Sequence, residues 1–171
     1  MGLIVNRTEL KRWSMYVGFI LIVMTMQEYL LTRLKIAGVH PMLGGVLTAC
    51  IAMYEGGLRG GAFGLFVGIV QDALLIGPEG YYSLVYMGSG LAAGFICDYM
   101  FRRNFLTACL WSLAVTALTT LLYFTIFFLL IGRAGISELW RTAVPEIIYS
   151  VILLPIIYFP VRYISQIGIE Q

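Results

Sequence analysis

The residues of this chain that could take part in chemistry are few, and Asp72 is the most conspicuous of them. It ends a row of residues with a spacing of four, preceded by Gly56, Gly60, Gly64 and Gly68. A carboxylate within an apolar helix must face protein or a water-filled cavity, because a charge at the centre of a membrane span costs about 3 kcal/mol or more. Asp72 is therefore predicted to be either a hydrogen-bonded strut between helices, the simpler interpretation, or a binding or coupling carboxyl.

A shorter version of the same pattern occurs further along the chain as Gly90, Gly94 and Asp98. Asp98 precedes Arg102 by four residues, a spacing at which opposite charges meet on one helix face, and this pair explains the carboxylate. Small residues at a spacing of four let two helix backbones approach closely. The two glycine rows, joined by a short connection, therefore predict a close antiparallel helix pair.

No other set of residues has the pattern of a catalytic, metal or cofactor site. His40 is the only histidine, and no metal ligand stands at a suitable spacing from it. Cys50, Cys97 and Cys109 lie in apolar surroundings without a Cys-x-x-Cys spacing, as buried packing residues do. The glycine run lacks the Lys-Ser/Thr of a phosphate-binding loop, and no Ser-His-Asp set or acid–base pair of carboxylates is evident. The chain is predicted not to be an enzyme and to need no cofactor or metal.

The elements that must position these residues are membrane helices. Hydrophobic residues make up 60% of the 171 residues and charged residues only 12%, with a mean hydropathy of +0.90. A soluble domain does not need this excess. Charge-free runs cover residues 13–27, 80–97 and 104–132, and the last is long enough to cross a hydrocarbon core of about 30 Å. The sequence predicts an all-α, polytopic membrane protein with no nucleic-acid partner.

Six helices are predicted within a single integral membrane domain, residues 1–171. They span about residues 13–31, 41–54, 58–76, 81–101, 105–131 and 144–164, after a short polar lead. Pro41 and Pro78 are predicted helix breaks, because proline is tolerated in the first turn of a helix but not in its interior. Pro155 and Pro160 predict a kink in the second half of the last helix.

The distribution of Lys and Arg predicts the orientation, since short cytoplasmic loops carry an excess of them. With six spans and a cytoplasmic N-terminus, the cytoplasmic segments hold seven of these residues and the outer segments four. Both termini are therefore predicted to be cytoplasmic.

The glycine row and its surroundings resemble the family of the rod shape-determining protein MreD. The resemblance rests on residues 21–27, on the Gly38-Val39-His40-Pro41 break, and above all on the row from Gly56 to Asp72 that is followed by Gly77 and Gly80. It covers about residues 20–100, and the last two helices match by hydropathy alone.

The resemblance implies a non-catalytic scaffold of the bacterial inner membrane, within the cell-elongation machinery that makes lateral peptidoglycan and maintains rod shape. It implies binding to MreC, in an assembly that includes MreB, RodA and a class B penicillin-binding protein. It also implies a six-helix transmembrane bundle similar to the substrate-binding subunits of energy-coupling-factor transporters. The alternative is that the chain is itself such a subunit and binds a vitamin-like molecule. Those subunits carry an Ala-x-x-x-Ala row on their first helix, and residues 13–31 contain no alanine.

Overall fold

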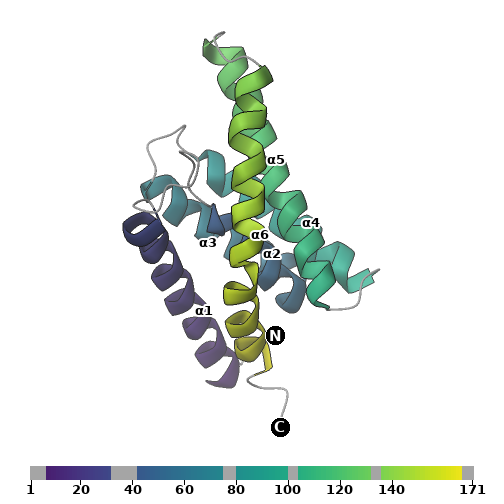
Figure 1. Cartoon of the computed structure of the whole chain (residues 1–171). Coiled ribbons are helices and arrows are strands. Elements are labelled where there is room, and N and C mark those ends of the chain that lie inside the picture. The colour runs from purple at the N-terminus through teal and green to yellow at the C-terminus, as the bar shows by residue number, and fades with distance from the viewer. Residues whose placement is uncertain (1–6, 32–41, 75–79, 100–103, 132–135, 167–171) are drawn as a thin grey trace.

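The computed structural model describes residues 7–31, 42–74, 80–99, 104–131 and 136–166 (Figure 1). Within these residues the fold is all-helical and has no strand, as the sequence predicts. Its elements are α1 (Arg7–Met26), a π-helical turn η1 (Gln27–Leu31), α2 (Leu43–Glu55), α3 (Gly57–Leu74), α4 (Tyr81–Tyr99), α5 (Phe105–Ile131) and α6 (Ile136–Gln166).

Helix α2 is the centre of the bundle. Its residues 43–53 are all buried, and it contacts α1, α3, α4, α5 and α6. A helix that is apolar all round has no face suited to water, so it is enclosed by its neighbours. Leu47, Ile51 and Met53, which have no exposed surface, form the middle of the core.

Helix α1 lies against this centre along one stripe. Tyr16, Ile20 and Met24 are buried at a spacing of four, which places their side chains on one helix face. Gln27 continues the stripe, and its side-chain oxygen accepts a hydrogen bond of 2.9 Å from the backbone N–H of Leu43. Because the first N–H groups of a helix have no partner within it, Gln27 at the start of η1 caps the start of α2.

Helices α5 and α6 are the longest elements and form a hairpin. They have 27 and 31 residues, equivalent to about 40 and 46 Å. Figure 1 shows this hairpin extending beyond the other helices at one end of the molecule, while the start of α1 and the end of α6 lie at the opposite end.

Two helices begin earlier than the sequence analysis predicts. Helix α1 begins at Arg7 instead of residue 13, and α6 begins at Ile136 instead of residue 144. Both added stretches are polar, but Glu, Lys, Arg and Leu are good helix formers, so polar composition there does not end the helix. Helix α2 begins at Leu43, two residues later than predicted. The predicted breaks at Pro41 and Pro78 lie outside the described residues.

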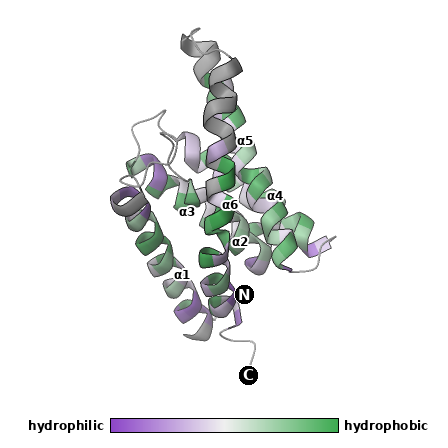
Figure 2. Cartoon of the chain, viewed as in Figure 1, coloured by the Kyte–Doolittle hydropathy of each residue, from purple (hydrophilic) through white to green (hydrophobic). Residues whose placement is uncertain are grey.

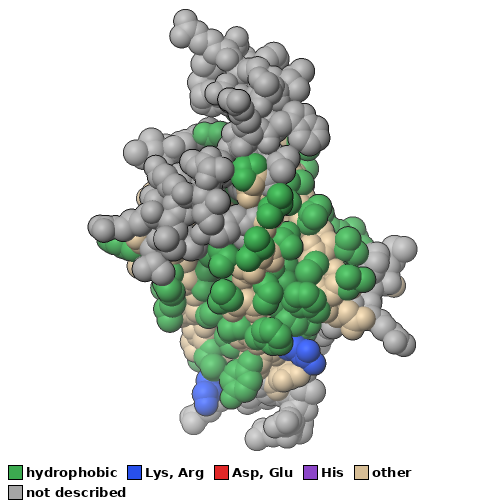
Figure 3. Space-filling view, viewed as in Figure 1, with side chains coloured by type: hydrophobic (Ala, Val, Ile, Leu, Met, Phe, Trp, Pro, Cys, Tyr) green, Lys and Arg blue, Asp and Glu red, His purple; other side chains and the backbone are tan. Residues whose placement is uncertain are grey.

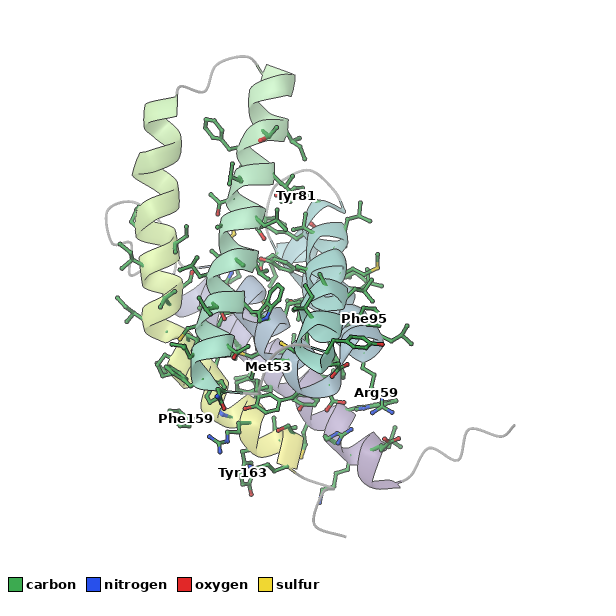
Figure 4. All side chains as sticks on the ribbon, turned by 90° about the vertical axis from the view of Figure 1, so that its right-hand side faces the viewer. Met53, Arg59, Tyr81, Phe95, Phe159 and Tyr163 are labelled. Carbon is green, nitrogen blue, oxygen red and sulfur yellow. The ribbon has the colours of Figure 1, made fainter. Side chains whose placement is uncertain are left out.

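Three prolines lie inside α6, at positions 145, 155 and 160. Each removes a backbone hydrogen bond and crowds the preceding turn, which bends a helix. Figure 4 shows the part of α6 that carries Phe159 and Tyr163 running at an angle to the rest of the helix, in agreement with the predicted kink.

The surface carries many large apolar side chains. They cover most of the coloured part of the face drawn in Figure 3, where the described Lys and Arg side chains are visible only near the end at which α1 begins and α6 ends. Along α1, hydrophobic residues occupy the middle and hydrophilic residues the two ends (Figure 2). Among the described residues, one segment is long and apolar enough to cross a membrane, Phe105–Ile126 in α5, and only 33% of its most apolar window is buried. The six-span arrangement stays a prediction.

Candidate functional site

The contact between α3 and α4 is the most extensive between any two helices of the structure. A Cβ atom added to Gly60 would lie 2.6 Å from the Cβ of Ala52 in α2 and 3.1 Å from the carbonyl oxygen of Gly90 in α4. One added to Gly64 would strike the carbonyl of Tyr86, and one added to Gly68 would strike the backbone of Ser83. The contacts move down α4 as they move up α3, so the two helices are antiparallel.

Gly90 and Gly94 of α4 are equally confined. A Cβ atom on Gly90 would lie 2.5 Å from the carbonyl oxygen of Gly60, and one on Gly94 would lie 2.5 Å from the Cα of Gly57. Real Cβ atoms are essentially never found this close to a backbone atom. The backbones of α3 and α4 therefore touch where the two glycine rows meet.

The structure contains a second row of packing glycines in α3, which was not predicted from the sequence. Gly57 and Gly61 face α4 side chains, since a Cβ atom on them would lie 2.7 Å from the ring of Phe95 and 2.5 Å from Leu91. Gly57 and Gly61 each follow a predicted packing glycine directly, and they are four residues apart, as those glycines are. This spacing could have predicted the second row.

Gly56 has a different role from the other glycines of its row. It ends α2 with φ at +85°, a conformation that side chains disfavour. Its N–H donates to the carbonyl of Ala52 at 3.0 Å. A Cβ atom on it would lie 2.8 Å from Oδ2 of Asp98, so the exposed end of α4 lies against the α2–α3 turn. Arg102, the predicted partner of Asp98, lies outside the described residues.

Asp72 is placed at the other end of the α3–α4 pair. Its Oδ1 accepts the backbone N–H of Tyr82 at 3.0 Å, and its Oδ2 accepts both the backbone N–H of Ser83 at 3.0 Å and the Ser83 hydroxyl. A carboxylate is favourable at a helix N-terminus, where N–H groups lack partners and the helix dipole is positive. Asp72 thus caps α4 from the end of α3, which is the geometry of a strut between helices.

An ion cluster at the opposite end joins α1, α2 and α3. The side chain of Glu55 is only 3% exposed. Nη2 of Arg12 donates a hydrogen bond to its Oε2 at 3.2 Å, and Nε of Arg12 lies 3.1 Å from its Oε1 as an ion pair. Arg59 lies 3.8 Å from Glu55 and 3.3 Å from Glu9, and its guanidinium is 5.5 Å from the centre of the Trp13 ring. This cluster is not among the sites predicted from the sequence. The four-residue spacing of Glu55 and Arg59 was a signal, but none linked Arg12 to Glu55.

Polar side chains also lie inside the bundle, around α2. Gln71 is completely buried, and neither atom of its amide has a hydrogen-bond partner among the described residues. Its oxygen lies 3.0 Å from the position that a Cβ atom on Gly44 would take. The hydroxyls of Thr48 and Thr116 are buried and without a described partner as well. These groups could bind a small polar molecule or water through hydrogen bonds, since buried polar atoms otherwise carry a desolvation cost.

Within the described side chains, no group of three or more His, Cys, Asp or Glu could hold a metal ion. His40 lies outside them. Cys50 and Cys97 are buried and Cys109 is partly exposed, and all three are free thiols.

Comparison with protein-family models, with curated proteins and with solved structures finds no match for this chain.

Proposed function

We propose that the protein is a non-catalytic scaffold of the bacterial inner membrane that serves cell elongation, as the resemblance to MreD implies. It would span the membrane six times, with both termini in the cytoplasm. The observation that carries the proposal is the α3–α4 contact. The residues that carry the resemblance, from Gly56 to Asp72, are those that bring two helix backbones together and cap one helix from the other.

A membrane location is supported by where apolar and basic side chains lie. Large apolar residues are exposed on several helices, for example Ile22 on α1, Leu84 on α4 and Leu110 on α5. Exposed apolar side chains on several helices suit lipid better than water. The basic residues visible in Figure 3 lie at the end shared by the start of α1 and the end of α6, as expected for cytoplasmic ends of spans.

A scaffold must keep a fixed shape when it binds its partners, and several contacts between helices stabilise the shape of this bundle. The ion cluster joins three helices at one end, and Gln27 and Asp72 cap neighbouring helices at the other. The proposed partner is MreC, within the assembly that also includes MreB, RodA and a class B penicillin-binding protein.

Affinity purification of the tagged protein in mild detergent, followed by mass spectrometry of proteins that accompany it, tests this function. We expect MreC in the eluate from the wild type. A Gly64→Leu variant, which forces α3 and α4 apart, should lose it, and Leu65→Ala on the exposed side of α3 should keep it. Wild-type protein that reaches the membrane but never retains MreC would contradict the proposal.

The second candidate function is small-molecule binding, as in a transporter substrate-binding subunit. The buried and unpartnered amide of Gln71, with Thr48 and Thr116, is the observation that favours it. Native mass spectrometry of the purified protein distinguishes the two functions. A bound small molecule that is lost in Gln71→Leu would support binding, and an unliganded mass in both proteins would support the scaffold.

A further inference from the structure

Side-chain contacts define two levels in the bundle. At the lower level, the hydroxyl of Tyr54 in α2 lies 2.9 Å from that of Tyr158 in α6, and the ring of Phe105 at the start of α5 packs on Tyr158 at 5.2 Å between ring centres. At the upper level, Asp72 binds the start of α4, and the Tyr81 hydroxyl donates to the carbonyl of Thr119 in α5. The lower level is the end where the ion cluster and Arg59 lie (Figure 4).

The two levels are closer together than the two faces of a bilayer's hydrocarbon core. From Arg59 to Asp72 along α3 is about 20 Å, and from Phe105 to Thr119 along α5 is about 21 Å, at a rise of 1.5 Å per residue. The hydrocarbon core of a bilayer is about 30 Å thick. Helix α5, however, continues through residues 120–131, about 18 Å beyond the upper level. The molecule is therefore short on the side of α1–α4 and long on the side of α5 and α6.

At the upper level, the residues on the short side are polar and those on the long side are apolar, in agreement with the difference in length. On the short side this level carries Glu28, Asp72 and Tyr29, whose side chain is 77% exposed. Charged residues and exposed tyrosines are typical of the membrane–water interface. On the long side, residues 120–131 of α5 contain no charged residue, and Leu121 and Leu122 are exposed just above the level of Thr119.

We propose that the protein thins the bilayer locally, drawing the outer lipid headgroups inward over α1–α4 while the bilayer keeps its ordinary thickness against α5. The inference rests on the proposed membrane location. A flat bilayer would leave Glu28 and Asp72 about 10 Å inside the hydrocarbon, whereas short hydrophobic segments are normally accommodated by thinning at modest cost.

Two exposed leucines form a matched pair for testing this. Leu74 lies two residues beyond Asp72, and Leu122 lies three residues beyond Thr119, so they stand at nearly equal heights above the lower level. Each would be replaced by cysteine in a background with Cys50, Cys97 and Cys109 changed to alanine, labelled with the fluorophore NBD, and reconstituted into dioleoyl phosphatidylcholine vesicles. Ile69→Cys, five residues below Leu74 on α3 and also exposed, is the control for membrane embedding.

We expect an aqueous cobalt quencher to reach the label at position 74 at least threefold more efficiently than the label at position 122. A lipid with a nitroxide on its acyl chain should quench the label at 122, and the label at 69, in preference to that at 74. Ala73→Cys and Leu121→Cys repeat the comparison and replace the first pair if either variant misfolds.

Equal quenching of 74 and 122 by the acyl-chain nitroxide, with 69 also in lipid, would overturn the thinning and leave the membrane location intact. Access of cobalt to all three labels would show that the chain is not embedded, so the proposed function would fail with the inference.

Discussion

The Oδ2 atom of Asp72 accepts two hydrogen bonds from Ser83, one from its backbone N–H at 3.0 Å and one from its hydroxyl. The other oxygen, Oδ1, accepts the N–H of Tyr82. Both oxygens of the carboxylate are thus engaged as acceptors on a single helix terminus. An asparagine offers only one acceptor oxygen, and its NH₂ group cannot accept an N–H.

We therefore predict that Asp72→Asn lowers the free energy of unfolding by about 1–3 kcal/mol, because one of two part-buried N–H groups is left without its acceptor. Asp72→Leu should cost more, because both N–H groups then lose their partner. Denaturation of the purified variants in detergent measures this order. A smaller loss of stability in Asp72→Leu than in Asp72→Asn would contradict the capping role. An Asp72→Asn protein that is stable but inactive in a cell-shape complementation assay would establish a charge-dependent coupling role.

A glycine-to-alanine substitution should reduce stability at a closely packed glycine but not at one with open space around it. Gly64→Ala places a Cβ atom against the carbonyl of Tyr86, and overpacking of this kind costs about 1–3 kcal/mol. Gly88 of α4 has nothing within 4 Å of its Cβ position, so Gly88→Ala should be neutral or stabilising by up to about 1 kcal/mol. Thermal unfolding in detergent compares the two, and equal melting temperatures would be incompatible with backbone contact at Gly64.

Substitutions in the ion cluster should reduce stability much more at its buried residues than at its exposed ones. Arg12→Gln removes the closer of the two arginines that pair with Glu55, a carboxylate that is 3% exposed, and breaking a buried pair costs up to about 3–5 kcal/mol. Glu9 is 37% exposed, so Glu9→Gln should cost less than about 1 kcal/mol. Restoration of stability in the double variant Arg12→Gln with Glu55→Gln, measured in a double-mutant cycle, would show that the loss comes from the unpaired charge.

Replacement of two buried glutamines by leucine should affect stability differently. Gln27→Leu removes the acceptor for the N–H of Leu43 and should lower the free energy of unfolding by about 1–3 kcal/mol. Gln71→Leu removes an amide that has no described partner, so stability should be unchanged or higher. Chemical unfolding of both variants, after delipidation, makes the comparison. A large loss on changing Gln71 would reveal a bound molecule or water that the amide holds.

The start of α1 and the end of α6 should be labelled from the same side of the membrane. Lys11 and Gln166 are both exposed and lie near these ends. In a background without the native cysteines, Lys11→Cys and Gln166→Cys should resist an impermeant thiol reagent added to intact cells and react after the cells are opened. Labelling of one site but not the other in intact cells would require an odd number of spans.

The helical class and one glycine row on each side of the α3–α4 contact follow from the sequence, whereas the second row, Gly57 and Gly61, was not predicted. Hydropathy over long runs predicts helices because an apolar segment must satisfy its own backbone, and a glycine spacing of four predicts one face of close approach because it follows the helix repeat. Helix α5 accordingly has the predicted bounds. Both signals are local, so neither needs knowledge of the partner helix.

The groups that meet across the bundle could not be predicted from the sequence, because their contacts depend on how the helices pack. Arg12 and Glu55 are 43 positions apart, and their contact depends on how α1 packs along its Tyr16–Ile20–Met24 stripe. The early starts of α1 and α6 were missed because a polar helix and a polar loop share the same composition. The central place of α2 and the unequal heights of the two sides arise from packing between helices of different lengths, a property that belongs to the assembled bundle and not to any one segment.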